Sequence, residues 1–246
     1  MESAIIVPAR LASQRFPRKL LHLVQGKPII LWTADRIKKV TPDIPLYFAV
    51  GDEELETVLT KAGYNCILTD PNLPSGTDRI AVANKEIGAR HVINVQADEP
   101  LVKAKEIRIL HQLLKLGDCD LATLSTPIKL ADDFNNRNRV KVVCDVNGNA
   151  LYFSRAPIPF SRDGLELGGG MAQLHLGLYG YTEEFLETFS ALAEGFLERV
   201  EKLEQLRALE NGYRIAVGEV SGGGIGIDTE ADAIRFNDMI QSGTAH

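Results

Sequence analysis

The stretch Ala4-Ile5-Ile6-Val7-Pro8 decides how the first half of this chain folds. It is a short, continuous apolar run that stops at a proline, a pattern typical of a strand buried on both faces of a parallel sheet. Outward from this run, strand-like and helix-like segments alternate, which indicates βαβ units. The predicted strands cover residues 4–7, 46–50, 65–68 and 91–95, and the predicted helices cover 28–39, 53–61, 78–87 and 103–115.

The second half of the chain has a different pattern. Its strand-like segments are separated by turns, at Asp145-Val146-Asn147-Gly148 and at Gly168-Gly169-Gly170. One helix is expected to begin near Thr182, because Glu183 and Glu184 would lie in its first turn. The other predicted elements are strands at 140–144, 151–153, 174–181 and 214–217 and helices at 201–211 and 229–240.

The composition is that of a folded protein without a membrane segment. Of the 246 residues, 45% are hydrophobic and 24% are charged, so the chain can bury a core. No stretch approaches the roughly 20 apolar residues that a membrane helix needs, and Glu2 precedes the first apolar run where a signal peptide would be basic. We therefore expect a soluble, cytoplasmic protein.

The net charge and the cysteine spacing disfavour nucleic-acid binding, zinc binding and a disulfide framework. The net charge of -6 argues weakly against nucleic acid as the main partner, although a local cluster of cations could still bind a small anion. Cys66, Cys119 and Cys144 form no CxxC pair, which gives no support to zinc binding or to a disulfide framework. We expect all three to be ordinary packing residues.

The loop after the first strand is the first candidate site. It reads Pro8-Ala9-Arg10-Leu11-Ala12-Ser13-Gln14-Arg15-Phe16-Pro17-Arg18-Lys19 and carries four cations. In open α/β sheets, ligands bind beyond the carboxyl ends of the strands, so these cations could form a cradle for a triphosphate. The alternative is a solvated basic loop. The loop has neither the Walker A pattern nor the GxGxxG pattern.

Carboxylates after the predicted strand 91–95 and before the predicted helix 229–240 are candidates for holding a metal ion. The segment Asn94-Val95-Gln96-Ala97-Asp98-Glu99-Pro100 ends a strand with two carboxylates, which suits Mg²⁺ held against substrate phosphates. An acidic helix N-cap is the alternative. The segment Gly226-Ile227-Asp228-Thr229 precedes the last helix, and taken alone it favours an N-cap over a metal site.

Three further motifs are ambiguous on their own. Ser75-Gly76-Thr77-Asp78-Arg79 could donate hydrogen bonds to a base or sugar, or simply cap a helix. In the predicted helix 201–211, Val200, Leu203 and Leu206 can face the core. The opposite face, with Glu201, Glu204 and Gln205, could bind a polyol or be solvated. A lone strand histidine such as His175 is more often structural than catalytic.

Taken in order along the chain, these motifs resemble those of the 3-deoxy-manno-octulosonate (Kdo) cytidylyltransferase family. The resemblance covers nearly the whole chain, and eight motifs in sequence are hard to obtain by chance. The matching segments are PARLASQRFPRK from Pro8, SGTDR from Ser75, NVQADEP from Asn94, VKVV from Val140, ALYFSRAPIP from Ala150, HLGLYGY from His175, EKLEQLRALENG from Glu201 and GIDT from Gly226.

The resemblance implies a fold, a reaction and partners. The fold would be α/β of the nucleotide-diphospho-sugar transferase kind, with a mixed, mostly parallel central sheet flanked by helices. It would form a single domain over 1–246, with a dimerisation and sugar-site subregion near 150–181. The reaction would transfer CMP from CTP to Kdo for lipopolysaccharide biosynthesis, with Mg²⁺ as cofactor and a homodimer as the assembly.

The resemblance also implies roles for particular residues. The catalytic residues would be Arg10, Lys19 and Asp98, and the metal ligands Asp98 and Asp228. The nucleotide would be bound by Pro8, Ala9, Arg10, Ser13, Arg15, Lys19, Ser75 and Gln96. The sugar would be bound by Gln96, Arg155, His175, Glu204 and Gln205.

The chain departs from the family pattern at two glycines. Arg18 stands where the family usually has the glycine of PGKP, and Ala97 where it has the glycine of NVQGDEP. A positive φ at either position would be strained for these side chains. The alternatives are therefore the same chemistry on a related acid sugar, such as 8-amino-Kdo or a sialic acid, and a nucleotide-sensing protein without catalysis. The missing glycine fingerprint disfavours a Rossmann dehydrogenase.

Overall fold

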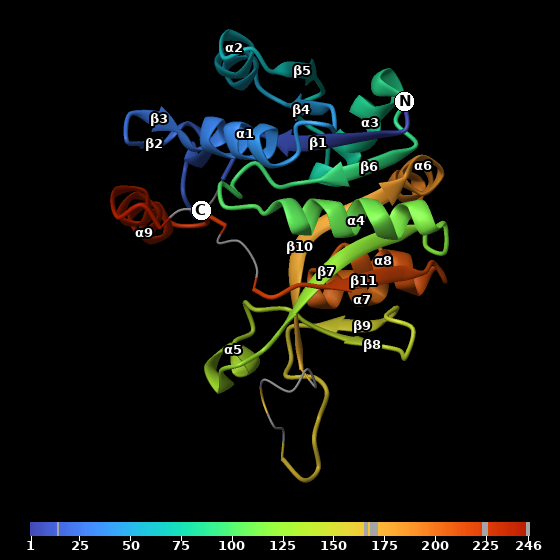
Figure 1. Cartoon of the computed structure of the whole chain (residues 1–246). Coiled ribbons are helices and arrows are strands. Elements are labelled where there is room, and N and C mark those ends of the chain that lie inside the picture. The colour runs from blue at the N-terminus through green and yellow to red at the C-terminus, as the bar shows by residue number, and fades with distance from the viewer. Residues whose placement is uncertain (14, 165–166, 168–171, 223–225, 245–246) are drawn as a thin grey trace. The chain divides into compact units, whose positions relative to one another are not determined.

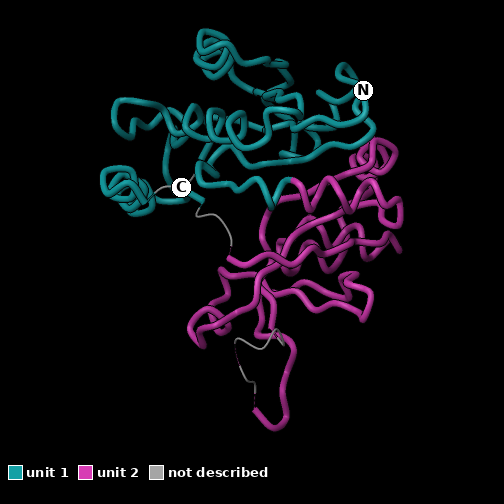
Figure 2. The backbone as a smooth tube through the Cα atoms, viewed as in Figure 1, with its two compact units in different colours: residues 1–107, 224–246 teal, residues 108–223 magenta. Residues whose placement is uncertain are grey.

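The computed structural model describes residues 1–13, 15–164, 167, 172–222 and 226–244. Two compact units make up the chain (Figure 2). Unit 1 comprises Met1–Ile107 and Gly224–His246, and unit 2 comprises Arg108–Gly223. The predicted turn at Gly168-Gly169-Gly170 lies outside the described residues.

Unit 1 is built on parallel strands in the order β6-β1-β4-β5 (Figure 1). All seven residues of β1 are buried, which explains why the run from Ala4 to Val7 is apolar without alternation. Ile5 of this strand lies opposite Leu46 on one side and Ile93 on the other. The strands are β1 (Ser3–Ala9), β4 (Leu46–Val50), β5 (Asn65–Leu68) and β6 (His91–Asn94).

The helices of unit 1 follow the strands as the alternating pattern predicts. The C-terminal helix packs against the first helix: Phe236 lies edge-on to Trp32, with ring centroids 5.7 Å apart, in a cluster that includes Phe16. A 3-10 turn, η1 (Lys19–Leu21), and a small hairpin of β2 (Leu23–Val24) and β3 (Lys27–Pro28) precede the first helix. The helices are α1 (Ile29–Val40), α2 (Glu53–Lys61), α3 (Gly76–Ile87) and α9 (Glu230–Gln241), and α4 (Ala104–Leu116) begins in unit 1 and continues into unit 2.

Unit 2 contains mixed strands. The long strand β10 pairs antiparallel with β7 and β8, and β11 pairs parallel with β7. The strands are β7 (Leu121–Pro127), β8 (Lys141–Cys144), β9 (Ala150–Ser154), β10 (Gln173–Thr182) and β11 (Ile215–Glu219). The helices are α5 (Ala131–Asn135), α6 (Glu183–Ala191), α7 (Phe196–Glu201) and α8 (Gln205–Glu210). The predicted α/β fold with mixed, mostly parallel strands and flanking helices is confirmed.

One predicted helix is wrong. The chain does not run as a single helix over 201–211, because Lys202 takes φ 55°, in the left-handed region, and ends α7. A new helix begins at Gln205. Consequently Val200 is 63% exposed rather than in the core, and Gln205 is 4% exposed rather than on a solvated face. The predicted core positions Leu203 and Leu206 are confirmed as buried.

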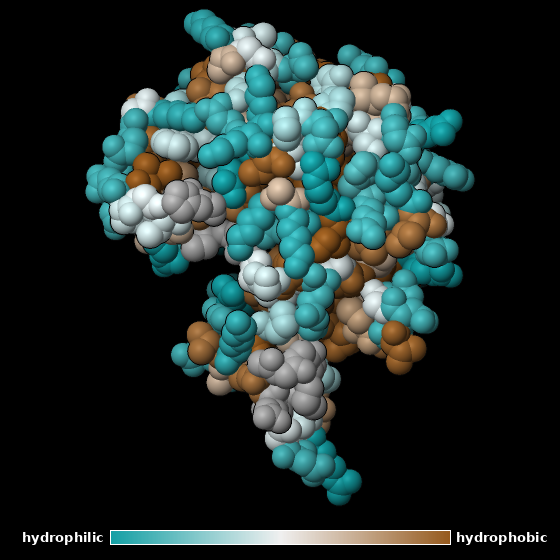
Figure 3. Space-filling view, in the orientation of Figure 1, coloured by the Kyte–Doolittle hydropathy of each residue, from teal (hydrophilic) through white to brown (hydrophobic). Residues whose placement is uncertain are grey.

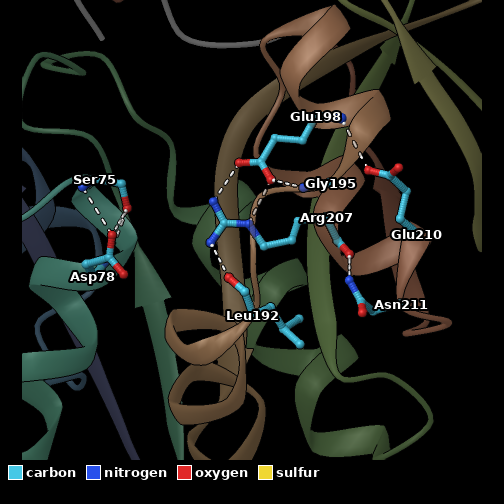
Figure 4. Close-up of polar contacts among 8 residues, drawn as sticks. All are labelled: Ser75, Asp78, Leu192, Gly195, Glu198, Arg207, Glu210 and Asn211. Atoms are coloured by element: carbon cyan, nitrogen blue, oxygen red, sulfur yellow. Dashed lines mark hydrogen bonds and ion pairs between the residues drawn. The ribbon is translucent and has the colours of Figure 1, made fainter.

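An ion pair between two short helices fixes this break (Figure 4). Arg207 donates from Nε to Glu198 Oε2 at 2.7 Å and from Nη2 to Oε1 at 2.6 Å. The carboxylate of Glu210 accepts from the backbone amides of Leu197, at 2.9 Å, and Glu198, at 3.3 Å. Since both partners of the ion pair are largely buried, the two helices are joined through charge-assisted hydrogen bonds.

Lys141 is a fully buried lysine in unit 2. Its ammonium donates to the carbonyl oxygens of Asn136 (3.1 Å), Arg139 (2.7 Å) and Arg155 (2.7 Å). Burial lowers the pKa of this ammonium. Three carbonyl acceptors use all three of its donors, so Lys141 ties the end of β9 to the loop before β8.

The three cysteines are free thiols. Cys119 is buried, and Cys66 and Cys144 are partly buried. Burial raises the pKa of each thiol to about 11. They behave as the packing residues that the sequence predicts.

Polar and apolar side chains are unevenly distributed on the visible face of the molecule (Figure 3). The face shown in Figure 3 is mostly hydrophilic, with hydrophobic side chains gathered over β8 and β9. Val146, in the turn between these strands, is fully exposed, and Leu151 on β9 is 62% exposed. Within the described part of the chain, no helix is long and apolar enough to span a membrane.

Candidate active site

A cavity of about 830 Å³ lies in unit 1, where β1 and β6 end. Every residue that the sequence analysis assigned to nucleotide or metal binding lines it. The lining residues are Pro8, Ala9, Arg10, Ala12, Ser13, Arg15, Lys19, Leu20, Ser75, Gly76, Arg79, Gln96, Ala97, Asp98 and Asp228.

The basic loop is held in place by the element that follows β4. The backbone amide of Leu11 donates to Asp52 Oδ2 at 2.8 Å, so Asp52 anchors the loop instead of capping α2 with its side chain. Three of the four loop cations line the cavity. The fourth, Arg18, forms an ion pair with Glu54 at 2.6 Å. Arg18 therefore does not line the predicted cradle.

The two predicted metal carboxylates meet at one lysine. Lys19 Nζ forms an ion pair with Asp98 Oδ2 and lies 3.3 Å from Asp228 Oδ1. Arg15 Nη2 is 3.2 Å from the same oxygen of Asp228. The backbone supports this juxtaposition, because the amide of Ile227 donates to the carbonyl of Asp98 at 2.9 Å. Two carboxylates from distant parts of the sequence thus share one cation.

Glu99 adds a third carboxyl group beside this pair. Burial, with the nearby charges of Asp98, Glu106 and Asp228, raises the pKa of Glu99 to about 8. Gly226 leaves room for it, since a Cβ there would lie 3.0 Å from Glu99 Oε1. The raised pKa favours the protonated form of Glu99, which limits the negative charge next to Asp98.

The structure shows which residues of two motifs cap a helix and which face the cavity. Ser75 is the N-cap of α3: its hydroxyl accepts from the amide of Asp78 at 3.1 Å and donates to Asp78 Oδ2 at 2.8 Å (Figure 4). Ser75 also lines the cavity, so the motif both caps and contributes to the site. The N-cap of α9 is Thr229, with Asp232 as its capping-box partner. The carboxylate of Asp228 is therefore left to face Lys19.

The two departures from the family glycines have different consequences. Arg18 takes φ 56°, the left-handed conformation that glycine adopts without strain. Ala97 is buried and lines the cavity without a positive φ, so its methyl group causes no backbone strain. Gln96, beside it, donates to Asn94 Oδ1 at 3.3 Å.

Arg79 is the one charged residue of the described cavity lining to which the sequence motifs assigned no role. Arg79 lines the cavity and is 2% exposed, although SGTDR was interpreted only through its hydroxyl groups. The signal was available, because an arginine in the first turn of a helix that begins at the site can turn toward the ligand.

The remaining predicted sugar-binding residues belong to unit 2. Arg155 donates to the carbonyls of Glu201 (2.7 Å), Lys202 (3.3 Å) and Arg137 (3.2 Å). Its backbone amide donates to Glu201 Oε2 at 2.9 Å, so the end of β9 is bound to the end of α7. These contacts fix the backbone just before the residues at the start of α8.

His175 lies on β10 among aromatic rings. Its Nε2 is 3.0 Å from Thr123 Oγ1, and its ring contacts those of Phe153 and Tyr179. Burial lowers the pKa of His175 to about 3. The charge of Glu204 contributes to the raised pKa of Tyr179, which places that carboxylate near the ring cluster. Gln205 Nε2 is buried without a hydrogen-bond partner among the described residues.

The donor set at Lys19 suits Mg²⁺. This ion is usually held by one or two carboxylates together with substrate phosphates and water, rather than by an all-protein cage. Asp98 and Asp228 supply two such carboxylates, and both of them already contact the ammonium of Lys19. Among the described residues no group of three or more His, Cys, Asp or Glu side chains forms a complete metal site, as this mode of binding requires none.

Comparison with known proteins places the chain in a family. The cytidylyltransferase family model matches residues 4–215. The chain is 43% identical over 243 residues to the 3-deoxy-manno-octulosonate cytidylyltransferase of a Nitratiruptor species, covering 95% of this chain and 98% of that protein. It is 39% identical over 251 residues to the same-named protein of Pelobacter propionicus, covering 98% of each.

The chain belongs to the 3-deoxy-manno-octulosonate cytidylyltransferase family. A solved structure described as CMP:2-keto-3-deoxy-manno-octonic acid synthetase complexed with CTP superposes on it with a TM-score of 0.92. That protein is 32% identical, and the alignment covers 99% of this chain and all of that one. A cytidylyltransferase from Leptospira borgpetersenii, 16% identical with a TM-score of 0.64, shares the fold. The family resemblance predicted from the ordered motifs is confirmed.

Proposed function

We propose that this protein transfers CMP from CTP to the anomeric hydroxyl group of Kdo, giving CMP-Kdo and diphosphate. The observation that carries the proposal is the meeting of Asp98, Asp228 and Lys19 at the basic loop of one cavity. Relatives named for this reaction match almost the full length of the chain, and one solved relative was obtained with CTP.

The basic loop is proposed to hold the triphosphate. Arg10, Arg15 and Lys19 line the cavity and provide cations that match the charge of the phosphates. Pro8, Ala9 and Ser13 also line the cavity, and the small side chains of Ala9 and Ser13 let the nucleotide approach the backbone N–H groups there. The hydroxyl group of Ser75 and the amide of Gln96 complete the nucleotide site.

Catalysis by these residues is proposed to be positioning and charge stabilisation. The sugar hydroxyl oxygen forms a bond to the α-phosphorus of CTP, the bond from that phosphorus to the bridging oxygen of the β-phosphate breaks, and diphosphate leaves. Lys19 and Arg10 stabilise the negative charge that builds on the phosphate oxygens in the transition state. The hydroxyl proton passes to solvent.

Asp98 and Asp228 would hold Mg²⁺ in this site. When bound, the ion would neutralise phosphate charge and lower the pKa of the sugar hydroxyl. Lys19 already occupies the position between these carboxylates, so its ammonium would be released toward the phosphates when the carboxylates take another cation.

The acidic sugar is proposed to be bound by Gln96 together with Arg155, His175, Glu204 and Gln205. The buried Nε2 of Gln205, which has no partner among the described residues, supports this role, because a buried amide donor without an acceptor is costly and a polyol hydroxyl would satisfy it. Arg155 supplies a positive charge of the right sign for a carboxylate.

We propose a homodimer formed near residues 150–181, a single functional domain over 1–246 and a cytoplasmic location. The exposed apolar side chains of Leu151, Phe160 and Phe196 in unit 2 support self-association. A role in lipopolysaccharide biosynthesis follows if Kdo is the acceptor.

A turnover assay tests the function. Diphosphate release from CTP is measured with Mg²⁺ in the presence of Kdo, 8-amino-Kdo, a sialic acid or no sugar. We expect release with Kdo at least about 100-fold above the no-sugar rate, since acceptor discrimination by buried polar contacts is large. Release with one of the other sugars but not with Kdo would replace the acceptor and keep the reaction. No release with any of them would contradict the transferase function.

A further inference from the structure

The hydroxyl group of Thr123 lies at an irregularity in the pairing of β7 with β10. Thr123 is fully buried on β7, and the register of the pair shifts between Leu176 and Tyr179 of β10. The hydroxyl oxygen is 3.2 Å from the carbonyl oxygen of Leu176 and 2.8 Å from that of Leu178. It also lies 3.0 Å from Nε2 of His175. One hydroxyl group therefore has three polar neighbours.

These three contacts determine which imidazole nitrogen of His175 carries the hydrogen. A threonine hydroxyl group has one proton to donate and lone pairs with which it can accept. Carbonyl oxygens can only accept, so the proton of Thr123 points to them, and the carbonyl of Leu178 is the nearer. His175 Nε2 must then be the donor to Thr123 Oγ1, because two lone pairs facing each other at 3.0 Å would repel.

A hydrogen on Nε2 of a neutral imidazole leaves Nδ1 as a bare acceptor. Burial lowers the pKa of His175 to about 3, and the rings of Phe153 and Tyr179 lie against it, with centroids 5.0 Å and 5.5 Å away. In the described part of the chain, Nδ1 of His175 has no hydrogen-bond partner, and it is not fully buried. The atom is therefore available to a donor group of a ligand.

We propose that Thr123 is a positioning residue that fixes the Nε2–H tautomer of His175, so that Nδ1 accepts a hydrogen bond from a hydroxyl group of the acceptor sugar. Without a hydrogen, Nδ1 cannot donate to the sugar carboxylate, so His175 recognises the polyol part of the sugar and not its acid group. This inference rests on the proposed function, because it takes the ligand of His175 to be the acceptor sugar. It adds a residue of β7 to which no sequence motif pointed.

Nitrogen chemical shifts of the histidine rings report the tautomer directly. Long-range proton–nitrogen correlation spectra of the whole protein, with isotope-labelled histidine and no ligand, distinguish a ring nitrogen with a hydrogen from one without, and His175→Gln assigns the signal. We expect the hydrogen on Nε2 and not on Nδ1 in the wild type and in Thr123→Ser, and a mixed or reversed pattern in Thr123→Val. A hydrogen on Nδ1 in the wild type would overturn the proposal, as would an unchanged pattern in Thr123→Val.

Steady-state kinetics test the sugar contact. In Thr123→Val the KM for Kdo should rise by about 10-fold, while kcat and the KM for CTP stay within about two-fold, as expected when one ligand hydrogen bond is weakened. Thr123→Ser keeps the hydroxyl group and should restore the wild-type KM. Thr126→Val is the matched control on β7, because the hydroxyl group that it removes is also buried but accepts from the amide of Gly222, at 2.9 Å.

The outcomes separate this proposal from the proposed function. An unchanged KM for Kdo in Thr123→Val, or an equal rise in Thr126→Val, would overturn the positioning role. If Thr123→Val fails to fold, the wild-type spectrum still decides the tautomer, and Thr123→Ser still tests whether a hydroxyl group suffices. A wild-type protein that does not use Kdo would remove the proposed function, whereas the spectrum, which needs no sugar, would still test the role of Thr123.

Discussion

The centre of the site is a lysine shared by two carboxylates. Lys19 reaches Asp98 from η1, and Asp228 joins them from the segment before α9. The two carboxylates repel each other, and the ammonium of Lys19 between them offsets this repulsion. If the carboxylates hold a metal ion and the cation holds a phosphate, as proposed, replacing any one of the three alters the binding of both ligands.

Asp98→Asn is expected to reduce turnover by about 100-fold or more, since it removes one of two carboxylates proposed to hold the metal ion. The measurement is diphosphate release from CTP and Kdo at saturating Mg²⁺. Asp238→Asn, an exposed acid on α9, should keep the wild-type rate. A rate within a few-fold of wild type for Asp98→Asn, with the protein folded, would refute the role of Asp98.

His175 should make the protein less stable in acid. Its pKa is about 3 in the folded state and about 6.5 when unfolded, so between these values the unfolded chain binds a proton that the folded chain does not. Stability is therefore lost as the pH falls below 6.5. From pH 7 to pH 5 we expect a loss of about 2 kcal/mol from this group.

Urea unfolding of wild type and His175→Gln at pH 7 and pH 5 measures this effect. The glutamine variant should lose about 2 kcal/mol less over this interval than wild type does. His22→Gln, at an exposed histidine, serves as the control. Equal pH dependence in wild type and His175→Gln would show that burial of His175 does not govern its protonation.

The sequence predicted most of the site but not its internal contacts. Residues of the basic loop and Asp98 could be assigned because a strand end is a ligand-binding position. Asp228 needed the family resemblance, since taken alone its motif favoured a helix cap. Arg79 was overlooked although it lies in the first turn of a helix that begins at the site, and the structure shows that it lines the cavity and lies against Gly51.

Among the elements, α7 and α8 are joined by a largely buried ion pair between Glu198 and Arg207. Either Glu198→Met or Arg207→Met should destabilise the protein by about 3–5 kcal/mol, because each leaves a buried charge without its partner. The double variant should be destabilised by less than the sum of the two. Thermal and urea unfolding of the four proteins measures this, and strict additivity would contradict a direct coupling.

Lys202 ends α7 in a conformation that favours glycine. Lys202→Gly should stabilise the protein by about 0.5–1 kcal/mol, since it removes the left-handed strain and loses only an exposed side chain. Lys115→Gly, in the last turn of α4, is the matched control and should be destabilising. Destabilisation by Lys202→Gly, measured by urea unfolding, would show that the lysine side chain has a packing role.

Elements with strong periodicity were predicted well, and breaks were not. The helix at Glu53–Lys61 and the strands at Leu46–Val50 and Asn65–Leu68 match their predicted bounds. The strand β7 was missed, and the break at Lys202 was hidden, because lysine is a good helix former. The break lies between α7 and α8, which the Glu198–Arg207 ion pair joins.

For the whole molecule, self-association is the property to measure. The exposed apolar residues of unit 2 predict that light scattering at micromolar concentration gives twice the monomer mass. Leu151→Glu places a charge on this surface and should shift the population toward monomer, with Leu23→Glu, at an exposed apolar position of unit 1, as the control. A monomeric wild-type protein would contradict the homodimer.

The three native thiols are expected to react slowly with thiol-labelling reagents. With pKa values near 11, Cys66, Cys119 and Cys144 carry little thiolate at neutral pH and react slowly with maleimides or haloacetamides. A cysteine introduced at the fully exposed Val146 would react much faster. One fluorophore could then be attached to the β8–β9 turn without first removing the native cysteines, which gives a direct optical report on sugar binding or subunit exchange.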